Sequence, residues 1–301
     1  MNYVILDMEW DSSFYPKEKR FINQIIQIGA VKLDEKFSVV DTFDVTVRSS
    51  FSKKVSGRFT ELTGITNDDM RSGIPLGDAV IRYNEWVGDG SVLMTWSTSD
   101  LYTMIENEKS LLDGLRFKMD MYLDLQKYIQ NEMKLIGLEC KSQISLEHAA
   151  QALGVDTAEY SLHTAKDDSL VCAALLKKFY CKERFSALVK DAHNPEFFER
   201  LYFKAYYISD LDSDYVDRDS LNFKCPRCER SARRVSKWRF KNYCFTARFY
   251  CNRCKFSFFG RVSFKKTYDN VIVKKRAVEP KPKVKEEKTD EMQPVSASVR
   301  K

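Results

Sequence analysis

The stretch "YVILDMEW", residues 3–10, begins with apolar residues and then places two acids two positions apart. Side chains alternate between the faces of a β-strand, so Asp7 and Glu9 project from one face and Leu6 and Met8 from the other. Two acids on an otherwise apolar strand are costly to bury without a cation or hydrogen bonds, and a divalent metal would compensate them. The pair alone also fits two acids exposed to solvent at a strand end.

Around this strand the sequence predicts a mixed sheet covered by helices. Alternation and β-branched residues predict strands in "QIIQIGAVKLDE" (24–35), "FSVVDTFDVTV" (37–47) and "SVLMTW" (91–96). Periodicity and capping residues predict helices in "LGDAVIRYNEWVG" (76–88), "SLEHAAQALGV" (145–155), "DDSLVCAALLKKFY" (167–180) and the aromatic-rich segment 194–216.

The charge of the chain is divided unevenly. Residues 225–276 hold 16 Lys and Arg against 2 acids, a net charge of +14, whereas residues 1–224 hold 27 against 36, a net charge of −9. A basic module on an acidic body suits a polyanionic partner, although it would also simply aid solubility. No apolar run approaches the roughly 20 residues of a membrane span, and no basic region precedes the first apolar stretch. We therefore expect a cytoplasmic protein.

Four of the eight cysteines form two C-x-x-C pairs, "CPRC" at 225–228 and "CNRC" at 251–254, separated by 22 residues. This spacing fits a zinc ribbon, in which four thiolates hold one structural Zn²⁺. The predicted ligands are Cys225, Cys228, Cys251 and Cys254. Cys244 is left over, and would replace one ligand if the second pair is misassigned. The isolated Cys140, Cys172 and Cys181 are expected to be small buried residues.

Basic and aromatic residues alternate between and after the cysteine pairs, a mixture suited to phosphate contact and base stacking. Arg234, Lys237 and Trp238 are the candidate nucleic-acid contacts. A module this small also needs aromatic residues for its own core, so the two uses compete.

The stretch "SLHTAKDDSL", residues 161–170, places His163 five residues before Asp168. On one regular helix these side chains would lie about 140° apart, so they can cooperate only if the helix begins between them. His163 otherwise fits a surface loop. Asp100 stands at the head of another predicted helix, where it could cap backbone N–H groups, although Thr98 and Ser99 could do so equally well.

Three of these stretches, "LDMEWD" (6–11), "TWSTSD" (95–100) and "HTAKDD" (163–168), together resemble the exonuclease motifs of the DEDDh superfamily. That superfamily comprises 3′-to-5′ exonucleases such as bacterial proofreading subunits, RNase T and the histone-mRNA exonucleases. The flanking "IIQIGAVKLDE", "ELTGIT" and "SLEHAAQALGV" extend the resemblance over residues 1–180. With its cysteine pairs, the chain looks similar to exonuclease-domain proteins of Firmicutes that end in a cysteine-rich module.

The resemblance implies an RNase H-like fold, a mixed sheet flanked by helices. It assigns metal binding to Asp7, Glu9, Asp100 and Asp168, and the role of general base to His163. The family spacing selects Asp168 over Asp167. The resemblance further implies two Mg²⁺, or Mn²⁺, and a terminal-nucleotide pocket lined by Leu62 and Thr63. Relatives often have Gly where this chain has Ser97.

We therefore expect an exonuclease domain at 1–190, a helical linker at 191–222, a basic zinc-ribbon module at 223–276 and a disordered tail at 277–301. The expected activity is metal-dependent hydrolysis at 3′ ends of single-stranded RNA or DNA, releasing 5′ mononucleotides. One alternative is an inactive nuclease fold that only binds nucleic acid, and another is a nuclease docked to a protein complex through its zinc ribbon. No membrane partner is expected, and the choice between RNA and DNA depends on pocket geometry.

Overall fold

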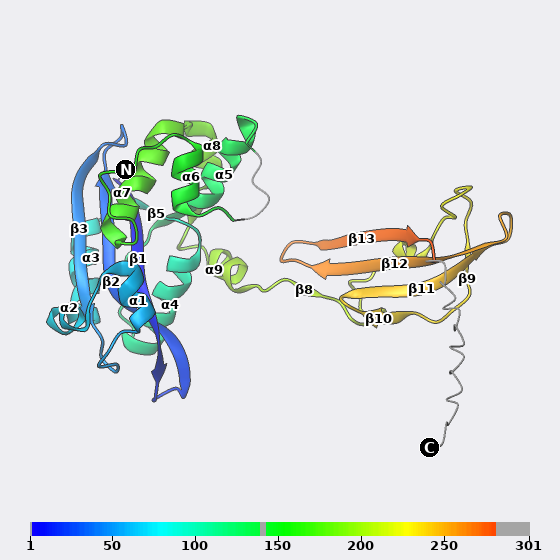
Figure 1. The fold of residues 1–301 in the computed structure, drawn as a ribbon, viewed down its shortest axis with the longest axis horizontal. Helices are drawn as coiled ribbons and strands as arrows, with labels where there is room; N and C mark the ends of the chain where they lie inside the picture. The colour runs from blue at the N-terminus through cyan, green and yellow to red at the C-terminus, as the bar shows by residue number, and fades with distance from the viewer. Residues whose placement is uncertain (1, 139–142, 281–301) are drawn as a thin grey trace, which may run out of the picture. The chain divides into compact units, whose positions relative to one another are not determined.

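The computed structural model describes residues 2–138 and 143–280. The chain divides into two compact units between Phe198 and Glu199 (Figure 1). We refer to residues 2–198 as unit 1 and residues 199–280 as unit 2.

Unit 1 is built on a mixed sheet around β1 (Asn2–Tyr15), which pairs antiparallel with β2 (Arg20–Leu33) and parallel with β5 (Ser91–Thr95). In the described residues the strand order is β4-β3-β2-β1-β5-β6-β7. The other strands are β3 (Val39–Arg48), β4 (Ile74–Pro75), β6 (Met121–Asp124) and β7 (Lys190–Asp191). The three strands predicted at 24–35, 37–47 and 91–96 are confirmed, and β1 continues beyond Trp10 to Tyr15.

Helices flank this sheet (Figure 1). They are α1 (Gly57–Thr63), α2 (Asn67–Ser72), α3 (Leu76–Val87), α4 (Ser99–Leu111), α5 (Leu125–Leu135), α6 (Leu146–Ala152), α7 (Ala165–Phe179) and α8 (Lys182–Leu188). α7 packs on β1 and β2 and contacts α5 and α6. A core that includes Ile5, Tyr128 and Leu176 joins these helices to the sheet, and burying each such side chain contributes about 1.5–3 kcal/mol. The predicted capping by Ser145 is confirmed, since its side chain accepts the His148 N–H.

The start of α7 approaches β2 unusually closely at Gly29. A Cβ at this position would lie 2.2 Å from the backbone carbon of Ala165 and 2.2 Å from the nitrogen of Lys166, so no other residue fits without moving the helix. Two hydrogen bonds fix the contact: the Ala165 N–H donates to Gln27 Oε1 at 3.3 Å, and the Ser169 hydroxyl donates to the Gly29 carbonyl at 3.3 Å. The helix is thereby held directly over the middle of β1 and β2.

Unit 2 is a small sheet over an aromatic core. Strands β10 (Arg239–Lys241), β11 (Cys244–Cys251), β12 (Phe256–Lys266) and β13 (Val271–Val278) follow one another in space. Two short strands, β8 (Tyr206–Tyr207) and β9 (Arg233–Arg234), pair with β12 and β11, and a 3-10 turn spans Arg218–Leu221. Phe249, Phe258 and Phe264 are buried at its centre.

The region expected to be a helical linker, 191–222, is organised differently. It is α-helical only over α9 (Pro195–Tyr202), and β8 then joins the sheet of unit 2. Ile208 and Val216 are buried in the aromatic core, so this region supplies apolar surface that the small sheet needs. β13 extends through Val278, two residues into the expected tail, while residues 281–301 of that tail and Cys140 lie outside the described residues.

Within the part of the chain that the structure describes, no helix combines the length and hydrophobicity needed to cross a membrane.

We predict that Gly29→Ala lowers the free energy of unfolding of unit 1 by about 3 kcal/mol or more, because the methyl group collides with backbone rather than with a movable side chain. Urea unfolding followed by tryptophan fluorescence measures the change. Gly77→Ala in α3 is the matched control, since a Cβ there meets nothing within 4 Å and alanine favours helix. Equal stability of the two variants would contradict the close contact.

Candidate active site and metal centres

Asp7 and Glu9 lie in the middle of the central strand β1. Asp7 is opposite Gly29 and Glu9 is opposite Gln27 in the antiparallel pair with β2. The register shifts between Glu9 and Trp10, which marks a β-bulge directly after the second acid. The extra residue, Ile26, belongs to β2. Asp7 projects to the same face as Gly29, whose Cβ would meet Ala165 and Lys166, so the two acids face the beginning of α7.

Asp168 is in the first turn of α7, and His163 precedes that helix. Thr164 is the N-cap, and its side chain accepts the Asp167 N–H. The helix thus begins between His163 and Asp168, as their spacing requires. His163 is exposed, and its backbone N–H donates to Asp168 Oδ1 at 3.3 Å. The histidine therefore lies beside Asp168 at the mouth of the site.

Asp7, Glu9 and Asp168 form one cluster. Each offers a carboxylate oxygen, and these oxygens lie within 4.8 Å of one another. Such an arrangement is suited to divalent cations, which prefer hard oxygen ligands. Asp167 points elsewhere, because its Oδ2 accepts the Ser161 N–H at 2.8 Å.

Asp100 lies next to this cluster but is not one of its three members. It is 3% exposed at the start of α4, and its Oδ1 accepts the Met8 N–H at 3.1 Å. Met8 separates Asp7 from Glu9 along β1, so this bond fixes the backbone between the two acids. Four acids from three segments of the chain thus meet at one place in unit 1.

The cluster concentrates negative charge in a poorly solvated place. Burial, followed by repulsion from Asp168 and Asp100, raises the pKa of Glu9 to about 8. Burial is also the main cause that raises the pKa of Asp100 to about 7, against the opposing Met8 N–H. The pKa of Asp7 is raised well above its ordinary value by burial and by its three acidic neighbours, and burial raises the pKa of Asp168. Ionising these acids together is therefore costly, and a bound cation would offset that cost.

Two non-glycine residues with left-handed backbones flank the acids. Ser97 has φ 81° and His163 has φ 70°, a region that L-residues seldom adopt. At Ser97 the cost is offset because its carbonyl accepts the Tyr122 hydroxyl at 3.1 Å and its own hydroxyl contacts Ser99. Glycine adopts this left-handed φ without strain, so it would also suit the position.

The predicted nucleotide-pocket residues lie at the end of α1. Leu62 is 53% exposed, whereas Thr63 is 7% exposed and its hydroxyl donates to the Phe59 carbonyl at 2.9 Å. α1 is tied to β1 because Asp11 accepts both the Ser56 N–H and the Ser56 hydroxyl at 2.8 Å. Leu62 thus offers an accessible apolar surface, and Thr63 supports the helix end.

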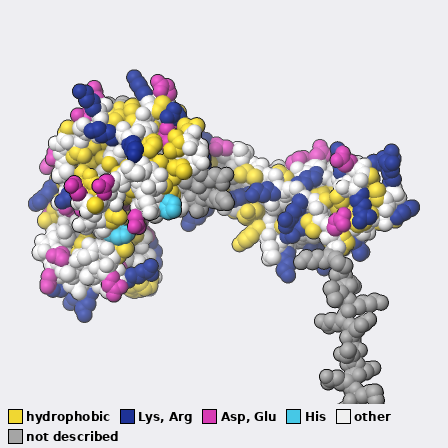
Figure 2. Space-filling view, turned by 45° about the horizontal axis from the view of Figure 1, so that its top comes forward, with side chains coloured by type: hydrophobic (Ala, Val, Ile, Leu, Met, Phe, Trp, Pro, Cys, Tyr) yellow, Lys and Arg dark blue, Asp and Glu magenta, His cyan; other side chains and the backbone are white. Residues whose placement is uncertain are grey.

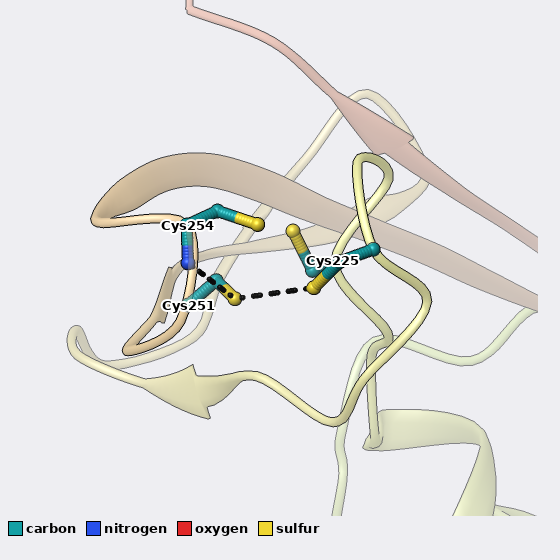
Figure 3. A group of neighbouring side chains, drawn as sticks. Cys225, Cys251 and Cys254 are labelled. Atoms are coloured by element: carbon teal, nitrogen blue, oxygen red, sulfur yellow. Dashed lines mark hydrogen bonds between the residues drawn. The ribbon is translucent and has the colours of Figure 1, made fainter.

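The four predicted zinc ligands in unit 2 converge, and Figure 3 labels three of them, Cys225, Cys251 and Cys254. The Sγ atoms of Cys225, Cys228, Cys251 and Cys254 lie within 4.8 Å of one another. Those of Cys228 and Cys251 are 3.6 Å apart, close to the roughly 3.8 Å between thiolates of a tetrahedral site with Zn–S bonds of about 2.3 Å. The Cys254 N–H donates to Cys251 Sγ and is the main cause that lowers the pKa of that thiol to about 7. Cys244 is outside the group, at the start of β11.

Two of the predicted nucleic-acid contacts lie together, since the guanidinium carbon of Arg234 is 6.0 Å from the centroid of the Trp238 ring. Trp238 is partly buried against Phe223 and Phe249 of the aromatic core. Arg234 is opposite Phe249 in the β9–β11 pair, and Lys237 is exposed between β9 and β10. Of the two expected uses of aromatic residues, base stacking and core packing, Trp238 serves core packing.

Gly29 and Gln27 are the positioning residues that the sequence prediction missed. Both lie in the stretch "IIQIGAVKLDE", which served only as flanking context. The available signal was a glycine inside an otherwise β-branched strand, which often marks a close backbone approach.

Comparison with known proteins identifies a family match that lies within unit 1. The family model described as Exonuclease matches residues 11–176, more than half of the chain. The PolC-type DNA polymerase III of Lactococcus lactis is 32% identical over 153 residues, which cover 48% of this chain and 9% of the polymerase. The probable 3′-5′ exonuclease KapD of Bacillus subtilis is 26% identical over 185 residues, covering 58% of this chain and 82% of KapD.

Solved structures agree on the fold. The nuclease domain of 3′hExo, a DEDDh family member bound to rAMP, aligns with a TM-score of 0.50 and 22% identity, covering 59% of this chain and 90% of that domain. The cell-death related nuclease 4 aligns with a TM-score of 0.50 and 20% identity, covering 59% of this chain and 62% of that nuclease. The RNase H-like mixed sheet with flanking helices is thus confirmed, and the chain belongs to the exonuclease family.

Proposed function

We propose that unit 1 is a metal-dependent 3′-to-5′ exonuclease that releases 5′ mononucleotides from single-stranded nucleic acid. The observation that carries the proposal is the convergence of Asp7, Glu9 and Asp168, with Asp100 and His163 beside them. The similarity to KapD, a probable 3′-5′ exonuclease, and to the nuclease domain of 3′hExo, whose structure was solved with the mononucleotide rAMP, supports the direction and the product.

Two Mg²⁺ ions, or Mn²⁺, fit this acid cluster. The fit is supported by the donor set, which is all carboxylate oxygen, and by the raised pKa values of Asp7 and Glu9, because a bound cation would offset their repulsion. We assign the ions to Asp7, Glu9 and Asp168, with Asp100 in support. When bound, such ions activate water and stabilise charge on the phosphate.

His163 is proposed to take the proton from the attacking water. Its exposed side chain and its backbone bond to Asp168 are consistent with a group that meets substrate at the rim of the site. A positioned imidazole is suited to accept a proton near neutral pH, and such a base typically contributes about 10²–10⁴ in rate. We propose that exposed Leu62 contacts the terminal nucleotide and that Thr63 holds the end of α1 in place.

A structural Zn²⁺ in unit 2 completes the proposal. Four convergent thiols match the tetrahedral ligand set of zinc ribbons, and two of the sulfurs already have the required separation. The alternative of an inactive nuclease fold that only binds nucleic acid is disfavoured, because a decayed site would be expected to lack at least one of the acids or the histidine.

Digestion of 5′-labelled single- and double-stranded RNA and DNA in Mg²⁺ tests the activity. We predict a ladder shortened from the 3′ end, abolished by Asp7→Asn and slowed about 10²–10⁴-fold by His163→Asn, because asparagine tolerates the left-handed backbone but cannot act as the base. Asp167→Asn is the control that should keep activity, since its amide oxygen can still accept the Ser161 N–H. Full activity of Asp7→Asn, or products from internal cleavage, would refute the proposal.

The stabilising effect of Mg²⁺ should grow with pH. In metal-free protein the carboxyls of Glu9 and Asp100 have pKa values raised to about 8 and about 7, so their contribution to stability is present at low pH and is lost as pH rises through those values. Mg²⁺ should therefore raise the thermal unfolding midpoint more near pH 8.5 than near pH 6. Glu9→Gln should flatten this difference, and an equal effect at both pH values would count against the acid cluster as the metal site.

Purified protein should contain one zinc ion per chain by elemental analysis. Cys225→Ser should release it and lower the stability of unit 2, because the metal supplies folding free energy to a small domain. Cys244→Ser should keep the metal, since Cys244 Sγ donates instead to the Val262 carbonyl at 3.4 Å. Zinc loss in both variants would show that the ligand set is wrongly assigned.

A further inference from the structure

The sheet of unit 2 has two chemically different faces. One face is the aromatic core, to which β11 and β12 contribute buried Phe245, Phe249 and Val262. Residues that alternate with these along the strands point the other way. We define the open face as this other side, whose cations on β10 to β13 are Arg239, Lys241, Arg248, Arg261, Lys265, Lys274 and Arg276.

The charge of the open face is uncompensated. Strands β10 to β13 contain no acid, and none of the seven cations forms an ion pair with any residue in 2–138 or 143–280. Arg261 and Arg276 are directly opposite in the β12–β13 pair, an arrangement that is destabilising for like charges. Arg261 Nε is also buried and has no hydrogen-bond partner among the described residues. An anion bound here would relieve both costs.

Two tyrosines stand at one end of the same face. Tyr207 of β8 is opposite Lys265 in register, and its ring stacks on Tyr243 with centroids 5.0 Å apart and planes 28° apart. Tyr243 is 66% exposed, so its ring is accessible to a ligand. Both tyrosines line a cavity of about 330 Å³ together with Arg261, Lys274 and Arg276. Figure 2 shows Lys and Arg side chains gathered on unit 2, the right-hand body in that view.

We propose that the open face of unit 2 binds single-stranded nucleic acid, with phosphates on the row of cations and a base stacked against Tyr243. Cations beside accessible aromatic rings are the combination that holds single strands without reading their sequence. Phosphate and base are common to RNA and DNA, so the chemistry admits both. The inference deepens the proposed function, on which it rests, by giving unit 2 the role of holding a strand of the kind that unit 1 degrades.

Cations on the core side of the sheet offer a matched pair of variants. Lys274 and Arg276 are on the open face and line the cavity. Lys266 is two residues after buried Phe264 and so is on the core side, with its Nζ 4.8 Å from the Tyr215 ring centroid. Arg234 is likewise opposite Phe249 on the core side. The double variants Lys274→Ala/Arg276→Ala and Arg234→Ala/Lys266→Ala therefore remove the same charge from opposite faces.

Binding is measured by fluorescence anisotropy with labelled oligo(dT) and oligo(U), over a range of salt concentrations without Mg²⁺, in full-length chains that also carry Asp7→Asn. We expect the open-face double variant to bind about tenfold more weakly and to lower the salt slope by about 1.4, and the core-side control to change affinity less than threefold. Tyr243→Leu should weaken binding about tenfold at every salt concentration, because stacking is not screened. The two oligonucleotides separate an RNA preference from a DNA preference.

Equal losses in the two double variants, or none in either, would overturn the assignment to the open face. Poly-glutamate serves as a competitor at the same concentration of negative charge as unlabelled oligonucleotide. If it displaces the labelled oligonucleotide equally well, an acidic protein partner would be favoured instead. Digestion by otherwise wild-type protein is scored separately. If the open-face variant binds normally while wild type digests 3′ ends, this inference fails and the proposed function stands. If only the open-face variant loses binding while wild type digests no substrate, the inference stands and the proposed function fails.

Discussion

The close approach of α7 to β2 at Gly29 is the constraint on which the candidate site depends. A Cβ at Gly29 would lie 2.2 Å from the helix backbone, so the absence of a side chain sets the separation of helix and sheet. That separation brings Asp168, in the first turn of the helix, within reach of Asp7 and Glu9 on the central strand. The hydrogen bonds from Ala165 and Ser169 to β2 hold the helix at this position. The geometry of the acid cluster is therefore set by backbone packing rather than by the acids themselves.

This packing makes the acids costly to ionise, because burial and mutual repulsion raise the pKa values of Asp7 and Glu9. Part of the cost is met within the protein, where Asp100 accepts the Met8 N–H and Asp168 accepts the His163 N–H. The left-handed backbones at Ser97 and His163 are a further cost of assembling the acids, since each residue lies in a turn beside one of them. Unit 2 also concentrates like charges beside a packed core. Aromatic rings fill the core on one face of its sheet, and uncompensated cations occupy the other face.

Much of this organisation could be predicted from sequence because it depends on local patterns. Strand alternation placed Asp7 and Glu9 on one face, and the spacing of His163 and Asp168 required a helix start between them, which Thr164 provides. The C-x-x-C spacing brought four thiols together. Local patterns failed where long-range packing decides: Tyr206 and Tyr207 form a strand of unit 2 instead of continuing a linker helix, and Trp238 packs into the core. The role of Gly29 depends on a helix 136 residues away in sequence, at Ala165.

The central claim, that three carboxylates from β1 and α7 hold divalent cations, is tested most directly by anomalous diffraction from crystals grown with Mn²⁺. The structure leads us to expect manganese peaks bounded by the carboxylate oxygens of Asp7, Glu9 and Asp168, and to expect them to vanish in crystals of Asp168→Asn. Peaks elsewhere on unit 1, or peaks that survive the loss of Asp168, would contradict the account.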